Sequence, residues 1–366
     1  MKIECVKEKI KSAVLLSEKM TGKNLSLPIL SGILLIAKGK TLTIRATNLD
    51  LGIETDIPAN VQKEGIAVVP GNILSSLLGT FFDENVFFEL QNNNLVVQTK
   101  NSKTLIKSFP PDDFPTLPKI QSRKESFEIE AQKFVLGFKS VLYAAALSDI
   151  KPEIASVYVY GEHGDIVFAA TDSFRLAEKK IDFISGKNIL PVIIPIKNIP
   201  EIIRVLETIS GNITISFNNS QISFEDKSLY LTSRLIDGIF PDYKQIIPKS
   251  FTTEAVVLKQ DFANALRAAN IFRDKFNQIN ILVDPQNKKT ELQSKNPNIG
   301  ENVICVDAAL QGERIKLNFN HKYVFDGLQP VEKDSISLQF NGELKPMVIQ
   351  GVGDKSFSYL VMPLNQ

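Results

Sequence analysis

The sequence predicts an α+β fold built from three similar domains in tandem. Local patterns recur at about one third of the 366-residue chain, apolar stripes with helical spacing open each third, and most of the remainder alternates with the period of a strand. A period of about one third of this length is the size of a domain, not of a solenoid unit. We therefore expect about two helices packed on antiparallel sheets in each third.

The recurring patterns come in the same order along the chain. A strand-like run enters a polar turn at Ala46–Leu49 and again at Ala170–Ser173. Asparagine-rich hairpin turns follow at Asn92–Asn94 and Asn218–Ser220, because Asn tolerates the left-handed backbone of tight turns. A strand followed by a helix is expected at 68–78, 193–206 and 317–328.

Each third opens with a strand and then an amphipathic helix. The apolar residues of these helices follow i, i+4 or i, i+4, i+7 spacing, which places them on one face. The stripes are Ile10 and Val14, then Phe134, Phe138 and Val141, then Phe262, Leu266 and Ala269. We expect all of them to pack into the core.

Two proline clusters mark the domain boundaries. Phe109–Pro118 cannot continue a strand, because proline fixes φ and lacks an N–H donor. The stretch Phe240–Ser250 repeats this punctuation. The predicted domains are therefore 1–122, 123–248 and 249–366, called the first, second and third thirds below.

Composition limits the possible partners and compartments. Lys and Arg number 42 against 41 Asp and Glu, so the net charge of +1 names no partner. The two cysteines, Cys5 and Cys305, lie far apart, and we expect two buried thiols in a reducing cytosol. No signal sequence is recognised and no apolar run reaches the roughly 18 residues of a membrane span. A cytoplasmic location is expected.

Catalytic residue patterns are scarce. His163 is placed at a hairpin tip and His321 at a helix start, and neither has a partner at metal-ligand spacing. There is no Walker A loop and no dinucleotide-binding glycine pattern. The carboxylates of Asp50 and Asp112–Asp113 are interpreted as solvated. We expect no enzyme activity, no metal and no cofactor.

Basic residues recur on or beside the opening helix of every third. Such a surface holds nucleic acid through phosphates without reading the base sequence. Repeated domains form a curved array, and two such chains in head-to-tail contact can close into a ring. The residue patterns thus favour a ring-forming homodimer on DNA.

The chain is similar to the bacterial DNA sliding clamp, the beta subunit of DNA polymerase III. The resemblance spans the whole chain and rests on Leu27–Leu34, Ala46–Leu51, Ala170–Ala177 and Tyr359–Leu364. It implies the DNA clamp fold, a homodimeric ring around duplex DNA, and no cofactor. It also implies partners: the polymerase III catalytic subunit, the clamp loader, and other polymerases and repair proteins with clamp-binding motifs.

The resemblance further implies a hydrophobic pocket for partner peptides. The matching residues are Val159, Thr171, Phe174, Arg175, Leu176, Pro241, Ile246, Leu360, Val361, Met362, Pro363 and Leu364. Expected DNA contacts are Lys7, Lys11, Lys23, Asn24, Lys139, Lys151, Arg204, Lys259 and Arg267. Expected dimer contacts are Lys103, Leu105, Ile106, Ile271, Phe272 and Glu301.

This sequence departs from the family pattern at several positions. Phe174 stands where such clamps often have His, and Gln245 where Arg is common. The stretch Asn298–Asn302 is less acidic than usual, so ring closure is expected to depend on apolar contact. Two other functions stay open: a peptide-binding adaptor that does not encircle DNA, and a repeat-built hydrolase.

Overall fold

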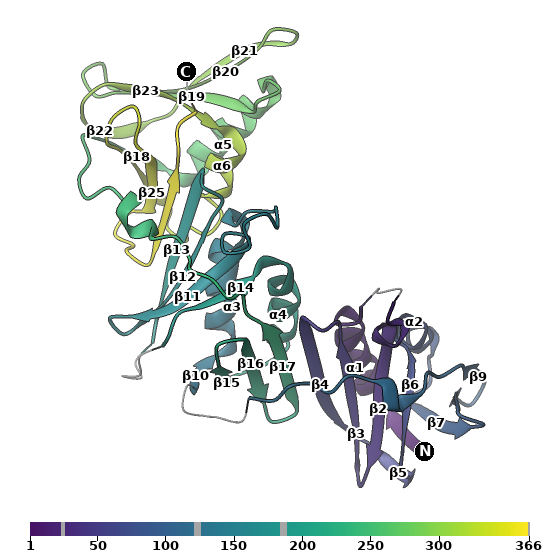
Figure 1. Ribbon diagram of the computed structural model, residues 1–366. Coiled ribbons are helices and arrows are strands. Elements are labelled where there is room, and N and C mark those ends of the chain that lie inside the picture. The colour runs from purple at the N-terminus through teal and green to yellow at the C-terminus, as the bar shows by residue number, and fades with distance from the viewer. Residues whose placement is uncertain (23–25, 121–125, 184–188, 365–366) are drawn as a thin grey trace. The chain divides into compact units, whose positions relative to one another are not determined.

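The computed structural model describes residues 1–22, 26–120, 126–183 and 189–364 (Figure 1). The chain divides into two compact units. Unit 1 comprises Met1–Val135 and Lys197–Asp237, and unit 2 comprises Leu136–Ile196 and Gly238–Gln366. Each unit is described by itself.

The described elements follow the predicted α+β pattern, with two α-helices in each third. The first third holds β1 (Lys2–Val6), α1 (Lys7–Lys19), β2 (Gly32–Lys38), β3 (Thr41–Thr47), β4 (Leu51–Pro58), β5 (Asn60–Lys63), β6 (Gly65–Pro70), α2 (Gly71–Thr80), β7 (Asn85–Gln91), β8 (Asn94–Gln98) and β9 (Lys103–Ile106). The second holds β10 (Ser126–Glu130), α3 (Ala131–Val141), β11 (Ser156–Glu162), β12 (Asp165–Thr171), β13 (Arg175–Asp182), β14 (Val192–Pro195), α4 (Ile199–Leu206), β15 (Asn212–Phe217), β16 (Gln221–Asp226) and β17 (Leu229–Arg234). The third holds β18 (Thr253–Leu258), α5 (Lys259–Ala269), β19 (Gln278–Asp284), β20 (Lys289–Asn296), β21 (Gly300–Cys305), β22 (Ala308–Gly312), β23 (Ile315–Asn320), α6 (His321–Asp326), β24 (Ser335–Phe340), β25 (Met347–Gly351) and β26 (Phe357–Val361).

The repeat predicted from the sequence is present at the level of single hydrogen bonds. In each third the first residue of the opening helix donates its backbone N–H to the carbonyl just before the strand that pairs with the opening strand, namely β7, β15 or β24. The three bonds are Lys7 to Glu84 at 2.8 Å, Ala131 to Gly211 at 2.9 Å, and Lys259 to Asp334 at 2.8 Å. The same chain geometry therefore starts each third.

All four described sheets are antiparallel. Unit 1 contains a five-stranded sheet, β5-β1-β7-β8-β9, and an eight-stranded sheet, β10-β15-β16-β17-β4-β3-β2-β6. Unit 2 contains a nine-stranded sheet, β14-β11-β12-β13-β26-β25-β24-β18-β22, and a four-stranded sheet, β21-β20-β19-β23. Two sheets thus cross from one third to the next.

These two crossings are built alike. In unit 1 the last strand of the second third, β17, pairs with β4 of the first, with Leu231 opposite Ile53. In unit 2, β26 is the last strand of residues 249–366 and pairs with β13 of the second third, with Leu360 opposite Leu176. We call these pairs the first junction and the second junction. The equivalent of β17 and β26 in the first third is β9, and the equivalent of β4 and β13 in residues 249–366 is β21. Both strands are sheet edges in this chain.

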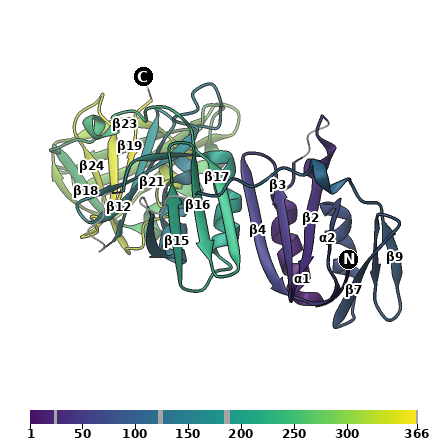
Figure 2. The same cartoon turned by 60° about the horizontal axis from the view of Figure 1, so that its bottom comes forward.

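The predicted apolar helix stripes are buried, which confirms their assignment to the core. In the first third α1 lies against β3 and β4 and beside α2 (Figure 2). Ile10 and Val14 of α1 are fully buried. In α3 the ring of Phe138 meets that of Phe168 edge-on, with centroids 5.4 Å apart.

Several local predictions can be compared with the structure. His163 lies at a hairpin tip with φ of 50°, and His321 begins α6 with Asn320 as N-cap, as expected. Asn92 and Asn93 adopt positive φ, whereas Asn218 holds its turn through its side-chain carbonyl.

The expectation of two buried thiols is wrong for one of them. Cys5 is buried, but Cys305 is exposed. Cys305 ends β21, and alternate side chains of this edge strand face solvent because no further strand or helix covers them.

Candidate peptide-binding site and nucleic-acid interface

The turn between β12 and β13 forms one rim of the candidate peptide site. The Thr171 hydroxyl donates to the Arg175 carbonyl at 2.7 Å, and the Asp172 carboxylate accepts the N–H groups of Phe174 and Arg175. These bonds hold Ser173 at a φ of 77°. Phe174, next in the chain, stays 61% exposed at the tip.

The predicted pocket residues divide between two faces of the nine-stranded sheet. Thr171 pairs with Leu176, and Leu176 with Leu360, so these three share one face. Because directly opposed residues of antiparallel strands point the same way, Val159 shares the other face with its partner Phe168, against α3. We call the first of these the helix-free face.

Arg175 and Val361 also pair with each other, on the helix side of the sheet. Val159, Arg175 and Val361 therefore lie on the helix side of the sheet, while Thr171, Leu176 and Leu360 lie on the helix-free face, where all three are buried. Sequence patterns did not distinguish the two faces.

Arg175 is the centre of a buried charge network. Its Nε is 3.0 Å from the Asp172 carboxylate, its Nη1 is 2.7 Å from the Asp326 carboxylate, and its guanidinium lies 4.3 Å from the Tyr323 ring centre. Burial opposes the charge, but Tyr359 and the two carboxylates outweigh it and raise the pKa of Arg175. The network ties the β12–β13 turn to α6.

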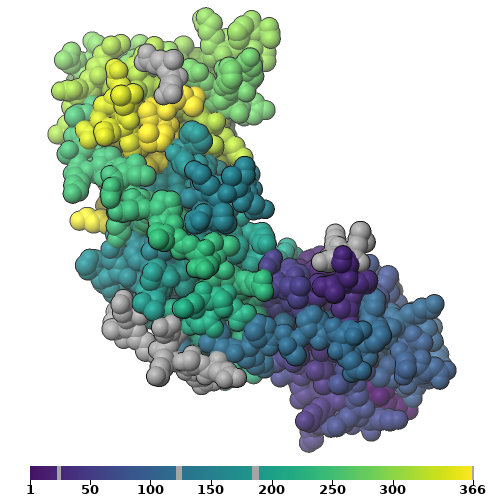
Figure 3. All heavy atoms as spheres, in the orientation of Figure 1, coloured from purple at the N-terminus to yellow at the C-terminus, as the bar shows by residue number. Residues whose placement is uncertain are grey.

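The C-terminal residues form a second rim. The N–H of Met362 donates to the Phe174 carbonyl at 2.8 Å, and that of Leu364 donates to the Asn318 carbonyl at 2.8 Å. Met362, Pro363 and Leu364 are half-buried. Figure 3 shows C-terminal residues (yellow) at the surface of this unit. Apolar side chains are thus held partly open to solvent beside Phe174.

The segment 240–246 covers the neighbouring part of the helix-free face. Phe240 stacks on Tyr158 with centroids 4.8 Å apart. The Tyr243 hydroxyl donates to the Glu178 carboxylate at 2.5 Å and lies 2.8 Å from the Tyr160 hydroxyl. Burial first, and Glu178 next, raise the pKa of Tyr243.

These bonds position the other two predicted pocket residues, Pro241 and Ile246. Ile246 is 49% exposed, whereas Gln245 turns back to Asp242 at 2.7 Å. Sequence reasoning missed the anchors Tyr243 and Glu178. The signal for Tyr243 was its place just after Phe240-Pro241, a pair that repeats Phe114-Pro115.

The basic residues that are predicted to contact DNA differ in their surroundings. The Lys7 Nζ donates to the Phe81 carbonyl at 3.2 Å, and Lys259, at the equivalent position of its helix, donates to the Val331 carbonyl. Both therefore tether helix starts to nearby loops. Lys11 is half-buried on α1.

The other basic residues predicted to contact DNA are more exposed to solvent. Lys139, Lys151, Arg204 and Arg267 are exposed. Arg204 pairs with Glu201 at 3.0 Å, and Arg267 lies over the Phe325 ring. Lys23 and Asn24 fall outside the described residues.

The predicted dimer contacts lie at two sheet edges, one in each unit. On β9, Leu105 is 56% exposed, Lys103 is exposed and Ile106 is buried. In unit 2, Ile271 is 66% exposed and the Phe272 ring lies beside Gly300 at the start of β21. Glu301 pairs with Lys295 at 3.6 Å.

The fold is that of the DNA sliding clamps. A solved sliding clamp of Bacillus subtilis superimposes with a TM-score of 0.95 at 24% identity, covering 100% of this chain and 99% of that one. A DNA polymerase III beta subunit of Thermotoga maritima gives a TM-score of 0.93 at 25% identity, with the same coverage. A beta sliding clamp of Synechococcus elongatus is 27% identical over 373 residues, covering 100% of this chain and 99% of the relative.

Family models identify the chain more closely. The N-terminal, central and C-terminal domain models of the DNA polymerase III beta subunit match residues 1–118, 128–242 and 244–365. The chain belongs to the DNA polymerase III beta subunit family. It is thus a beta sliding clamp, a processivity factor of the polymerase, as the sequence resemblance predicted.

The described residues show neither a metal-binding cluster nor a membrane-spanning helix. The described residues bring together no group of three or more His, Cys, Asp and Glu that could hold a metal ion. In the described part of the chain, no helix is both long and apolar enough to cross a membrane.

Proposed function

We propose that two copies of this chain close into a ring around duplex DNA and tether polymerases through one peptide site on each chain, without catalysing a reaction. The observation that carries this proposal is the pair of unmatched strands, β9 and β21. At the first junction β17, the last strand of the second third, pairs with β4, the fourth strand of the chain. At the second junction β26, the last strand of residues 249–366, pairs with β13, the fourth strand of the second third. Only β9 and β21 lack such a partner among the described strands, so a second copy can supply it.

The internal repeat also supports a register for this intermolecular pairing. Ile106 is the last residue of β9. Ser233 is the last paired residue of β17 at the first junction, and Val361 is the last paired residue of β26 at the second. These three residues are equivalent positions of the repeat. Carrying the register over places Ile106 opposite the partner's Gly300, Leu105 opposite the partner's Glu301, and Lys103 opposite the partner's Val303. Lys103 is then diagonal to the partner's Glu301, within reach of an ion pair.

One buried atom is consistent with this register. The Asn302 side-chain oxygen is buried and has no hydrogen-bond partner in the described chain. Leaving such an oxygen unpaired costs about 1–3 kcal/mol. In the proposed register Thr104 lies opposite the partner's Asn302 and offers a hydroxyl donor. Ile271 and Phe272 would flank the closed edge with apolar surface.

The peptide site is proposed at the second junction. Its floor is Thr171, Leu176 and Leu360. Its rims are Phe174 and Met362–Leu364 on one side and Pro241 and Ile246 on the other. An adaptable Met and several exposed apolar side chains suit a surface that binds more than one motif. Val159, Arg175 and Val361 support it from behind.

DNA contacts are proposed to be few and loose. Lys11, Lys139, Lys151, Arg204 and Arg267 supply positive charge on or near helices, and none needs to read a base. Lys7 and Lys259 would act mainly as helix tethers. Because the ring would hold DNA by topology, weak phosphate contacts leave it free to slide.

We propose domains at 1–122, 123–248 and 249–366. The three consecutive family matches, at 1–118, 128–242 and 244–365, support a division close to these boundaries. A role on bacterial DNA would place the protein in the cytoplasm. Its proposed partners are the polymerase III catalytic subunit, the clamp loader and motif-bearing repair proteins.

Retention on DNA tests the ring directly. The protein is loaded on nicked circular DNA by its loader and ATP, and retention is compared before and after the circle is cut. Retention on the circle with rapid loss from cut ends is expected. Equal retention on both would mean surface binding and contradict the ring, and loss from both would favour a peptide-binding adaptor.

A further inference from the structure

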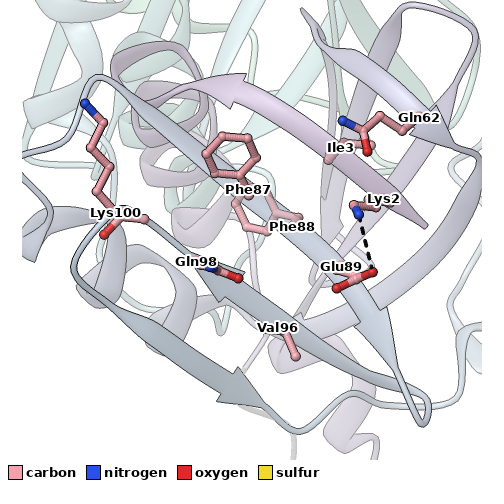
Figure 4. A pocket seen from close by; sticks show the side chains of 10 residues that line it. Lys2, Ile3, Gln62, Phe87, Phe88, Glu89, Val96, Gln98 and Lys100 are labelled. Carbon is pink, nitrogen blue, oxygen red and sulfur yellow. Dashed lines mark ion pairs between the residues drawn. The ribbon is translucent and has the colours of Figure 1, made fainter.

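The five-stranded sheet of the first third carries a cavity of about 430 Å³ (Figure 4). Phe87 supplies apolar surface, because its side chain is 40% exposed, whereas Val96 is buried beneath the lining. Lys2 and Lys100 lie on opposite sides of the Phe87 ring, as Figure 4 shows. The volume is in the lower part of the range for ligand sites.

Comparison between the thirds singles out Phe87. It is the third residue of β7, just as Thr214 is of β15 and Ser337 is of β24. The three positions have equivalent cross-strand partners: Gln98, Glu225 and Gln350. The other two thirds thus place a small hydroxyl side chain where the first exposes an aromatic ring.

Val96 does not share this difference. It stands opposite Glu89 in β7–β8 and is buried, and residues 249–366 have Val348 at the same position, opposite Gln339. Val96 therefore belongs to the fold. Phe87 is different, because the repeated sheet also forms with Thr214 or Ser337 in its place, so its exposed ring indicates binding rather than folding.

The charges around the cavity are unbalanced. Lys2 stands directly opposite Lys63 across β1 and β5, an arrangement of like charges that disfavours pairing. Glu89 offers one carboxylate, 3.9 Å from the Lys2 Nζ. Within the described chain, Lys63 and Lys100 form no ion pair. Bound anions would offset this excess of positive charge.

We infer that this cavity binds an acidic peptide segment with a central aromatic residue. Its aromatic side chain stacks on Phe87. Its flanking carboxylates meet Lys100 on one side and Lys2 on the other. The order of cation, aromatic ring and cation in the cavity complements the order of acid, aromatic and acid in the peptide. The site lies in unit 1 and is independent of the peptide site at the second junction.

The test uses the full chain and a fluorescein-labelled peptide, acetyl-Asp-Asp-Phe-Asp-Asp-amide, in fluorescence polarisation. Phe87→Thr installs the residue of the second third and should weaken binding by about tenfold, the loss expected when one aromatic side chain is no longer buried. Phe82→Thr is the matched control, because Phe82 is 98% exposed in the same third and lies outside the cavity. It should leave the affinity unchanged.

Two further arms separate the contributions. Lys100→Gln should weaken binding severalfold and reduce its dependence on salt. A peptide with Ala in place of Phe should bind about tenfold more weakly. Equal binding of the two peptides, no effect of Phe87→Thr, or no binding of the Phe peptide would each overturn the inference. So would sedimentation showing that Phe87→Thr disrupts self-association and leaves peptide binding intact, because the surface would then belong to a second copy.

Discussion

The two internal junctions have the same strand pairing, yet their helix-free faces differ. At the first junction Leu117 lies over Gly52 so closely that a Cβ on that glycine would meet it at 2.4 Å, with Thr232 at 3.3 Å. At the second junction Leu176 stands at the position of Gly52, and Leu360 at that of Thr232. Leu176 and Leu360 are themselves buried, but apolar surface stays open beside them, on Phe174 and Ile246. A junction can become a binding site where the chain leaves its own apolar surface open.

The turns beside the two junctions repeat this contrast. Thr47 and Asn48 make the same set of turn hydrogen bonds as Thr171 and Asp172. The residue at the tip differs: Asp50 pairs with Lys197 at 2.7 Å, whereas Phe174 is exposed. Backbone geometry is shared, and side-chain chemistry decides which turn can meet a ligand.

The largest expected effect comes from making the second junction resemble the first at its buried charge. Arg175 corresponds to Leu51, so Arg175→Leu leaves Asp172 and Asp326 without their cation. Removing one partner of a buried ion pair typically costs about 3–5 kcal/mol. We expect a loss of this order in the free energy of unfolding, measured in urea.

A second variant separates the effect of the unpaired carboxylate from the effect of losing the Arg175 side chain. Adding Asp326→Asn to Arg175→Leu removes one orphaned charge and should recover part of the lost stability. If the double variant were no more stable than the single one, the charge pair with Asp326 would not be the cause.

Opening the first junction should also cost stability. Leu117→Ala removes the side chain that covers Gly52 and leaves a cavity, so the free energy of unfolding should fall by about 2–4 kcal/mol. Ile246→Ala, at a half-exposed position of the second junction, should cost under about 1 kcal/mol. Similar losses at the two positions would show that the junctions are equally sealed.

The third prediction concerns affinity. Met362→Ala combined with Leu364→Ala removes one rim of the second junction and should weaken a labelled clamp-binding motif peptide by at least about tenfold. Thermal unfolding serves as the folding control. An unchanged affinity in fluorescence polarisation would remove the C-terminal residues from the site.

The smallest effect expected is a pH dependence confined to the first junction. Burial raises the pKa of Glu54, but hydrogen bonds from Lys119 and Arg45 outweigh it and lower the pKa overall. A carboxyl with a lowered folded pKa stabilises the fold above its unfolded pKa, about 4.3, and loses that contribution as pH falls through the folded value. The wild-type chain should therefore be more stable than Glu54→Gln at neutral pH, and this difference in the free energy of unfolding should shrink as the pH falls into the acid range. A stability difference that stays constant down to acid pH would contradict this.

Sequence patterns predicted what depends on near neighbours. Helix stripes such as Ile10 and Val14, and the turn at Thr171–Asp172, follow from short-range spacing and hydrogen bonding. Contacts between distant residues could not be predicted in this way: Arg175 and Asp326 are 151 positions apart, and the recurring patterns do not pair them.

Two other outcomes needed the sheet itself. Cys305 was expected to be buried, but strand order makes β21 an edge, and no local pattern shows that. Val159 was grouped with Leu176, although cross-strand pairing puts them on opposite faces. The family resemblance supplied the pocket residues as a set, and register separates those on its floor from those behind it.

The stoichiometry of motif-peptide binding tests most directly the claim that only one junction per chain is open. Isothermal titration of the full chain with an unlabelled clamp-binding peptide should give one site per chain. A value of two sites per chain, with the second lost when Leu117 is altered, would contradict the claim, because the first junction would then bind as well.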